Sequence, residues 1–165
     1  MKIIYIKLFI RVSIAIGFLS AVADRFGMWP KEKSAWGNWS SFIEYTKLLN
    51  PWIPENFINF TGIVATAAEI ILAIFLLIGF KTSLSGKLSG FLILIFGVAM
   101  TITTGIKAPL DYSVFSAAAA GFGLSLINEK YLEIDMLFDK KIVIRVLKLF
   151  LIKKADSFFS QRISL

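Results

Sequence analysis

One carboxylate of this chain lies inside a long apolar stretch, where a charge is expensive. Glu69 falls near the middle of the apolar segment 57–80, and an acidic residue at the centre of a membrane helix costs about 2.5–3.5 kcal/mol on insertion scales. Small residues surround it at helical spacing, which marks a face where membrane helices approach closely. We expect Glu69 to face the interior of a bundle, either as a titrating functional group or, the interpretation we favour, as a polar clamp between helices.

Other charged residues lie close to apolar segments and are candidates for the same site. Arg11 lies at comparable depth in the segment 3–23 and is the cation that could pair with Glu69. Four more lie at segment ends that an antiparallel bundle would bring to one side, and we call them the outer charged cluster: Asp24, Arg25, Lys107 and Asp111. Their carboxylates and cations could close the bundle by ion pairs, which we favour, or could bind a small anion or acid.

The residue types that are missing narrow the chemistry. The chain has no Cys and no His, and these side chains dominate zinc, copper, haem and iron–sulfur sites. We therefore predict no metal site. A Cys or His nucleophile or base is also excluded, which leaves carboxylates, Lys, Tyr and hydroxyls for proton transfer, and we identify no catalytic residue among them.

Four apolar segments must position these side chains. Of 165 residues, 57% are hydrophobic and only 18% are charged, which is typical of a membrane protein rather than a soluble domain. The segments 3–23, 57–80, 84–106 and 112–127 predict an all-α, integral membrane four-helix bundle over residues 1–128. The fourth segment is short, and we expect Asp111 to cap its first turn. Ala21-Val22-Ala23 after an apolar run also resembles a signal peptide, but we expect the first segment to be retained.

The longest loop, 24–56, is rich in aromatic residues, including Trp29, Trp36, Trp39 and Trp52. Trp and Tyr settle at the level of the lipid headgroups. We predict a short helix from Asn38 to Asn50 that lies over the outer end of the bundle. An aromatic anchor without a ligand is the interpretation we favour.

Residues 129–165 form a basic tail in which the apolar run 142–152 is too short to cross a bilayer. Basic and apolar side chains fall on different helical faces there, which predicts an interfacial amphipathic helix. Twelve Lys and Arg residues lie on the side of the two termini, against five on the other side. By the positive-inside rule, both termini are cytoplasmic in a multi-pass cell membrane protein. We therefore interpret the net charge of +7 as a sign that the basic residues face a lipid bilayer, and we expect no nucleic acid as a partner.

Glycines on the third segment predict close helix packing. Gly86 and Gly90 have the GxxxG spacing, and the fourth segment offers small residues such as Ala117 and Gly121. Such faces pack backbone to backbone, either within the bundle or with a partner, which includes a second copy of the chain.

Several stretches together resemble the DoxX family of four-span membrane proteins. They are Ser20-Ala21-Val22-Ala23-Asp24-Arg25-Phe26-Gly27, Trp36-Gly37-Asn38, Tyr45-Thr46, Asn50-Pro51 and 105–116. The resemblance covers about residues 8–126, and Met28-Trp29-Pro30 departs from the family pattern. It implies links to quinone-dependent thiosulfate oxidation or to membrane redox and oxidative-stress assemblies, without an agreed catalytic residue.

These observations lead us to expect an accessory or scaffold subunit of a membrane redox complex, without catalytic turnover of its own and with membrane or redox proteins as partners. The first alternative is a small-solute or proton-linked transporter that uses Glu69 and the outer charged cluster. The second is a quinone-using enzyme subunit, although no quinone site can be identified from the sequence. We expect no other cofactor.

Overall fold

The computed structural model describes residues 2–137, and over that range the protein is helical without a strand. Six α-helices and two 3-10 turns follow one another within residues 2–137. They are α1 (Ile3–Arg25), η1 (Lys31–Lys33), α2 (Trp39–Leu49), α3 (Glu55–Ile78), α4 (Thr82–Thr104), α5 (Lys107–Asp111), α6 (Val114–Leu126) and η2 (Ile134–Met136). The all-α prediction is confirmed.

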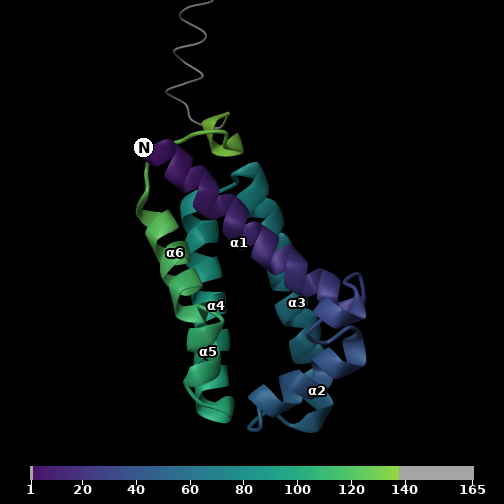
Figure 1. Ribbon diagram of the computed structural model, residues 1–165. Coiled ribbons are helices and arrows are strands. Elements are labelled where there is room, and N and C mark those ends of the chain that lie inside the picture. The colour runs from purple at the N-terminus through teal and green to yellow at the C-terminus, as the bar shows by residue number, and fades with distance from the viewer. Residues whose placement is uncertain (1, 138–165) are drawn as a thin grey trace, which may run out of the picture.

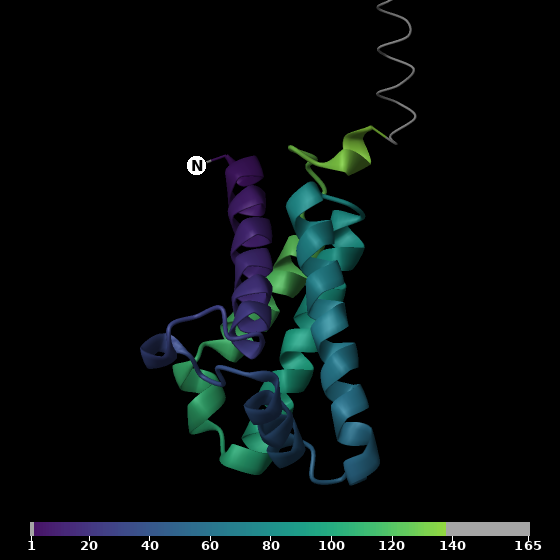
Figure 2. The same cartoon turned by 90° about the vertical axis from the view of Figure 1, so that its right-hand side faces the viewer.

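The bundle consists of two helix pairs. α4 lies along α6 and α1 lies along α3, and these are the most extensive contacts between elements (Figure 1). α2 packs on α3 and α4, and Figure 2 shows it beside the half of α3 that follows the loop. The two pairs are joined by a core from α1, α3 and α6 that includes Ala15, Phe18, Ala73, Leu76 and Leu124.

The glycine faces of α4 and α6 meet as their spacing predicts. A Cβ placed on Gly121 would lie 2.7 Å from the backbone nitrogen of Gly90 and 3.0 Å from the carbonyl oxygen of Gly86. A Cβ on Gly90 would lie 3.0 Å from the carbonyl oxygen of Ala118. The two backbones are therefore in direct contact, as small-residue faces of membrane helices allow.

Local signals set most helix ends. The side chain of Asn38 accepts a hydrogen bond from the Ser41 N–H at 2.9 Å, and this cap confirms the helix expected from that position. α3 starts directly after Pro54 and ends at Gly79, whose φ of 70° is left-handed. That conformation favours glycine, because other residues carry a Cβ that clashes there.

The start of the fourth apolar helix differs from the prediction. Asp111 does not cap it, because Asp111 is the last residue of α5 and pairs with Lys107 one turn earlier. The chain then breaks at Ser113, which has a φ of 56°, and α6 begins at Val114. Pro109 fits in the first turn of α5, where backbone N–H groups have no helical partner anyway.

Three helices, α1, α3 and α4, are long and apolar enough to cross a membrane. α6 is apolar but has only 13 residues, about 20 Å at the helical rise of 1.5 Å per residue. Residues 129–137, at the start of the predicted tail, lie against the end of the bundle (Figure 1). The predicted amphipathic helix of the tail lies outside the described residues.

Candidate functional site: an ion pair on the wall of an interhelical cavity

Glu69 is buried in the bundle, and its partner is Arg25. The Nη2 group of Arg25 donates a hydrogen bond to Oε1 of Glu69 at 2.9 Å, and Nη1 lies 2.5 Å from Oε2. Nη1 also donates to the hydroxyl of Thr66 at 2.7 Å, one turn before Glu69 on α3. The side chains of both charged residues are at most 3% exposed. The carboxylate in the apolar helix is thus neutralised by a cation from α1.

This pairing corrects the proposal that Arg11 faces Glu69. Arg25 ends α1 at the level of Glu69, while α3 extends about 20 Å further toward its own start at Glu55. α2 packs beside that additional length. The prediction assumed that the end of α1 and the start of α3 lie at the same level of the bundle. Under that assumption Arg25 lies at the outer end of the bundle, far from Glu69.

Aromatic rings complete the surroundings of Arg25. Its guanidinium carbon lies 4.0 Å from the ring centroid of Phe42 and 5.5 Å from that of Trp36. Cation–π contacts of this kind contribute about 2 kcal/mol when the cation is desolvated. Phe42 belongs to α2 and Trp36 to the loop before it, so the loop closes over the ion pair and shields it from water.

Asp24 holds this loop in place. Its carboxylate accepts hydrogen bonds from the backbone N–H groups of Ala35 at 2.9 Å and Trp36 at 3.0 Å, and from the hydroxyl of Ser34. The two neighbours Asp24 and Arg25 therefore have different tasks. Asp24 fixes the backbone that carries Trp36. Arg25 pairs with Glu69, and the indole ring of Trp36 covers the guanidinium of Arg25.

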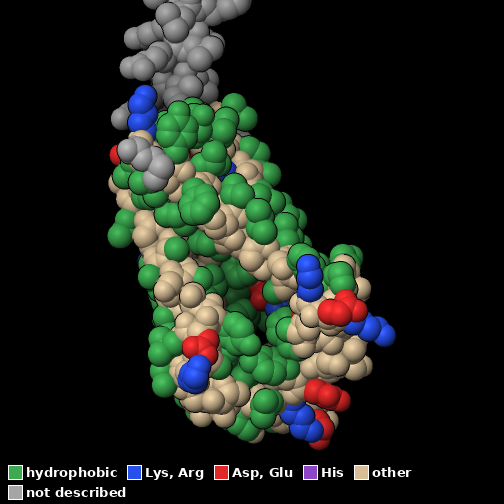
Figure 3. All heavy atoms as spheres, in the orientation of Figure 1, with side chains coloured by type: hydrophobic (Ala, Val, Ile, Leu, Met, Phe, Trp, Pro, Cys, Tyr) green, Lys and Arg blue, Asp and Glu red, His purple; other side chains and the backbone are tan. Residues whose placement is uncertain are grey.

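The ion pair lies on the wall of a cavity of about 1820 Å³ between the two helix pairs. The walls come from α1, α2, α3, α4 and α6, and most of the lining side chains are apolar. Figure 3 shows a hollow on the side where α1 crosses the bundle, with acidic and basic atoms visible inside it. The small-residue face of α1 lines the cavity, and a Cβ on Gly17 would meet nothing within 4 Å.

Two polar atoms of the ion pair remain without a hydrogen bond. They are Nε of Arg25 and Oε2 of Glu69, both buried. Oε2 is in ionic contact with Nη1 but is not aligned for a hydrogen bond, whereas Nε has no hydrogen-bond acceptor in the part of the chain that the structure describes. A buried N–H without a partner costs about 1–3 kcal/mol, and an acceptor on a bound molecule would recover part of that cost.

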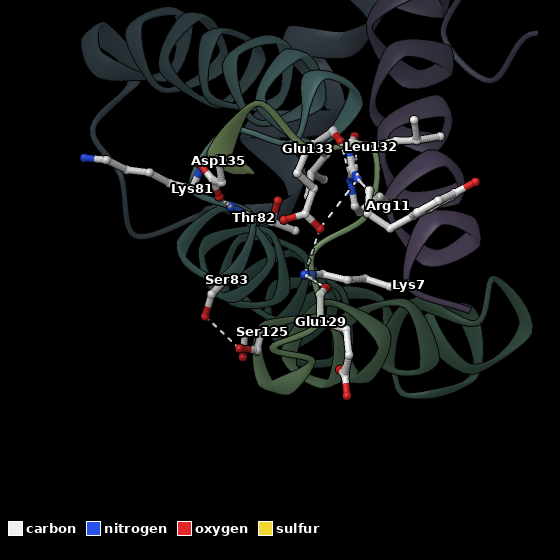
Figure 4. Close-up of polar contacts among 12 residues, drawn as sticks. Lys7, Arg11, Lys81, Thr82, Ser83, Ser125, Glu129, Leu132, Glu133 and Asp135 are labelled. Carbon is white, nitrogen blue, oxygen red and sulfur yellow. Dashed lines mark hydrogen bonds and ion pairs between the residues drawn. The ribbon is translucent and has the colours of Figure 1, made fainter. Parts of the chain in front are cut away.

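Arg11 belongs to a second polar cluster (Figure 4). The cluster lies at the end of the bundle opposite α2 (Figure 1). The guanidinium of Arg11 donates to the last carbonyls of α3, to Leu76 through Nε at 2.9 Å and to Leu77 through Nη2 at 3.1 Å. It also donates to the carbonyls of Tyr131 at 3.0 Å and Leu132 at 3.1 Å. Arg11 therefore caps the carboxyl end of α3, where a cation also opposes the helix dipole.

Lys7, one turn before Arg11, completes this cluster. Its ammonium lies 2.7 Å from Oε1 of Glu133 and donates to the carbonyl of Glu129 at 2.7 Å. Glu133 also lies 3.7 Å from Arg11. A Cβ on Gly79 would lie 2.6 Å from both Nη2 of Arg11 and Cα of Glu133, so the glycine also provides space for the cluster.

Asp135 connects the same segment to α4. Its carboxylate accepts hydrogen bonds from the backbone N–H groups of Lys81 at 2.7 Å and Thr82 at 3.0 Å. This is an N-cap supplied from a distant part of the sequence, because α4 has no side-chain cap of its own. Residues 129–135 thus contact the first turns of α1 and α4 and the last turn of α3.

The outer charged cluster is divided by the structure. Asp24 and Arg25 are buried as described, whereas Lys107 and Asp111 pair with each other on the surface of α5, with side chains 86% and 57% exposed. An exposed pair one helical turn apart contributes only about 0.3–0.5 kcal/mol. Only Asp24 and Arg25 line the cavity.

The four loop tryptophans also have different surroundings. Trp36 covers Arg25, and Trp29 donates to the carbonyl of Ser20 at 3.2 Å. Trp39 donates to the side-chain oxygen of Asn59 at 3.1 Å, while Trp52 is 57% exposed. Trp29 and Trp36 line the cavity.

Several polar residues of the two clusters were absent from the sequence-based candidates. Lys7 was not among those candidates, although it is four residues from Arg11 and shares its helix face, a spacing that could have suggested a common acidic partner. Glu133 and Asp135 could be recognised as acidic residues within a basic tail. Thr66 lies one turn from Glu69 but carried no charge to distinguish it. Within residues 2–137, no group of three acidic residues suited to a metal ion is found.

Comparisons of the chain with protein-family models, with curated proteins and with solved structures found no match.

Proposed function

We propose that this chain is a four-span membrane protein that holds a lipophilic small molecule in the cavity between its helices. The observation that carries the proposal is the cavity of about 1820 Å³ with a buried ion pair on its wall. Binding sites for small molecules are mostly apolar hollows with a few polar groups that fix orientation. Arg25 and Glu69 supply the polar groups here, and the apolar lining suits the body of a molecule dissolved in the bilayer.

The fourth span in this proposal is α6. At about 20 Å it is shorter than the apolar core of a bilayer, which is about 30 Å thick. α5 precedes it and extends the same crossing, and α6 packs along α4 over its glycine face. With four spans, both termini lie on one side, and the distribution of Lys and Arg makes that side cytoplasmic. The loop tryptophans would then anchor the outer end.

The biological role we propose is that of an accessory subunit of a membrane redox complex. The link to redox complexes rests on the resemblance of 20–27, 36–38 and 105–116 to the DoxX family. The role is that of an accessory subunit because the chain contains no Cys or His that could carry electrons or ligate a redox metal. A quinone is one candidate occupant of the cavity. Under this proposal the chain positions or stores the molecule, and a partner protein performs the chemistry.

A proton-linked transporter is the second candidate, and the position of Glu69 on the cavity wall favours it. A carboxylate that exchanges protons must at times leave its cation, so this function requires the contact between Arg25 and Glu69 to open. The accessory-subunit proposal requires it to stay closed.

The test of the binding proposal uses two glycines with open space around them. A Cβ would meet nothing within 4 Å at either Gly17 or Gly123. Gly17 lines the cavity, whereas Gly123 does not line it. Protein purified in lipid nanodiscs should carry a lipophilic molecule, detected by native mass spectrometry after lipid subtraction. Gly17→Trp should weaken its retention because the indole projects into the cavity, whereas Gly123→Trp should leave retention unchanged.

Equal retention of the same molecules by both variants would contradict the binding proposal. The proposed partnership is tested separately, by identifying proteins that co-purify with the wild-type chain in mild detergent. The proposal expects a redox protein that is recovered reproducibly, and its repeated absence would count against the accessory role while leaving the binding function intact.

A further inference from the structure

The charges around the cavity restrict what kind of molecule fits. Arg25 and Glu69 neutralise each other, and the nearby carboxylate of Asp24 is held by Ser34, Ala35 and Trp36. An anion beside the ion pair would face the carboxylates of Asp24 and Glu69, and the one unpaired cation of the described lining is Lys33, on the solvent-exposed 3-10 turn. Lys33 and Glu44, the other charged residues of the lining, are exposed to solvent.

The unused hydrogen-bonding capacity of the site points in the same direction. The Nε–H of Arg25 is buried and has no acceptor within residues 2–137, so an oxygen placed beside it would gain a hydrogen bond. An ammonium group has no lone pair to accept that hydrogen bond. A hydroxyl or carbonyl oxygen has one, and a hydroxyl can also donate to Oε2 of Glu69, the second atom without a hydrogen bond.

The rest of the lining is suited to a hydrocarbon body. Apolar side chains on the rim are well exposed, including Phe9 at 73%, Phe60 at 63% and Ile95 at 62%. These three residues belong to α1, α3 and α4, the helices apolar and long enough to cross a bilayer. The rim of the cavity therefore faces the apolar phase in which such a molecule dissolves.

We propose, resting on the binding function above, that the cavity selects an uncharged molecule that has a hydroxyl or carbonyl oxygen at one end and an apolar body. The oxygen accepts a hydrogen bond from Arg25, and the body occupies the apolar space toward the rim. The ion pair is the selectivity element, since its neutrality disfavours charged ends and its free Nε–H favours an oxygen over a plain hydrocarbon.

Three probes of equal chain length test this selectivity: 2-bromododecan-1-ol, 2-bromododecanoate and 1-bromododecane. Bromine quenches tryptophan fluorescence at contact range, and Trp36 lies on the cavity wall beside Arg25. A variant with Trp29→Phe, Trp39→Phe and Trp52→Phe leaves Trp36 as the reporter. The matched control keeps Trp52 instead, which is exposed and does not line the cavity. Both are measured in nanodiscs at equal probe content of the membrane.

We expect the alcohol to quench Trp36 at about tenfold lower content than the bromoalkane, which corresponds to one hydrogen bond to a charged donor. The ionised acid should quench Trp36 least. Trp52 should not distinguish the probes. Glu69→Gln leaves Arg25 as an unpaired cation in the wall, so in that background the acid should become the strongest quencher of Trp36.

Equal quenching of Trp36 by all three probes, weakened by Gly17→Phe, would overturn the selectivity proposal and leave the binding function standing. An unchanged order of probes in the Glu69→Gln background would also overturn it, because the ion pair would not set the preference. Quenching of Trp36 that never exceeds that of Trp52 would contradict the binding function itself.

Discussion

Arg25 and Glu69 are 44 residues apart in the sequence, yet the Nη2 group of one lies 2.9 Å from the Oε1 atom of the other. The contact joins the last turn of α1 to the interior of α3. It is enclosed by Thr66, Phe42 and Trp36, so neither partner can turn to water if the other is removed.

Removing one charge of this pair should therefore destabilise the protein strongly. Glu69→Leu leaves a buried guanidinium without its carboxylate, which costs about 3–5 kcal/mol in comparable pairs. Glu69→Gln retains hydrogen-bonding atoms and should cost clearly less. Thermal unfolding of the purified variants in one detergent measures the difference.

The double variant Arg25→Leu/Glu69→Leu is the control, since it removes both charges and should recover most of the lost stability. A Leu variant as stable as wild type would show that the pair is not buried as described. Transport or growth that fails with Glu69→Gln, at normal protein level and stability, would favour the transporter.

The contact between α4 and α6 predicts a large difference between two neighbouring glycines. Gly121→Ala places a methyl group 2.7 Å from the Gly90 nitrogen, and relief of that clash requires the helices to separate, at about 1–3 kcal/mol. Gly123→Ala meets nothing and should stabilise α6 by about 0.5–1 kcal/mol. Melting temperatures in detergent should move in opposite directions. Equal shifts would contradict the backbone contact.

The cluster at the other end of the bundle predicts a specific role for Glu133. Glu133→Ala removes the carboxylate in contact with both Lys7 and Arg11, and the buried ammonium of Lys7 keeps only a carbonyl partner. We expect a loss of about 3 kcal/mol in stability. Glu129→Ala is the matched control, because Glu129 binds Lys7 through its backbone, and it should melt near the wild-type temperature. A wild-type melting temperature for Glu133→Ala would contradict this role.

Topology can be tested without background, because the chain has no native Cys. Single cysteines at Lys107 and at Asn128 flank α6. In intact cells a membrane-impermeant maleimide should label Lys107→Cys and should leave Asn128→Cys unlabelled until the membrane is opened. Labelling of both positions from outside would show that α6 does not cross, and the termini would then lie on opposite sides.

The sequence was sufficient to predict the helices and the faces on which small residues meet, since both follow from local periodicity. Glu69 could be identified as facing the interior because small residues surround it at helical spacing within an apolar segment. Its partner could not, because pairing depends on where α1 ends relative to α3. That offset of about 20 Å is set by the packing of α2 and the loop, and no single helix encodes it. The sequence therefore indicates Arg11 as the cation for Glu69 and places Arg25 in the outer charged cluster, whereas the fold pairs Glu69 with Arg25.

The second cluster has a consequence for how the bundle assembles during synthesis. Arg11 contacts two carbonyls of α3 that are translated 65 and 66 residues after it, whereas the other partners of Lys7 and Arg11 are translated about 120 residues after them. While α1 is inserted, its two cations can be satisfied only by water or by lipid phosphates near its first turns. The α4–α6 pair can form before residues 129–133 are made. The contacts of the first half of α1 with residues 129–133 therefore form last, and they are made by a segment translated after α1 to α6.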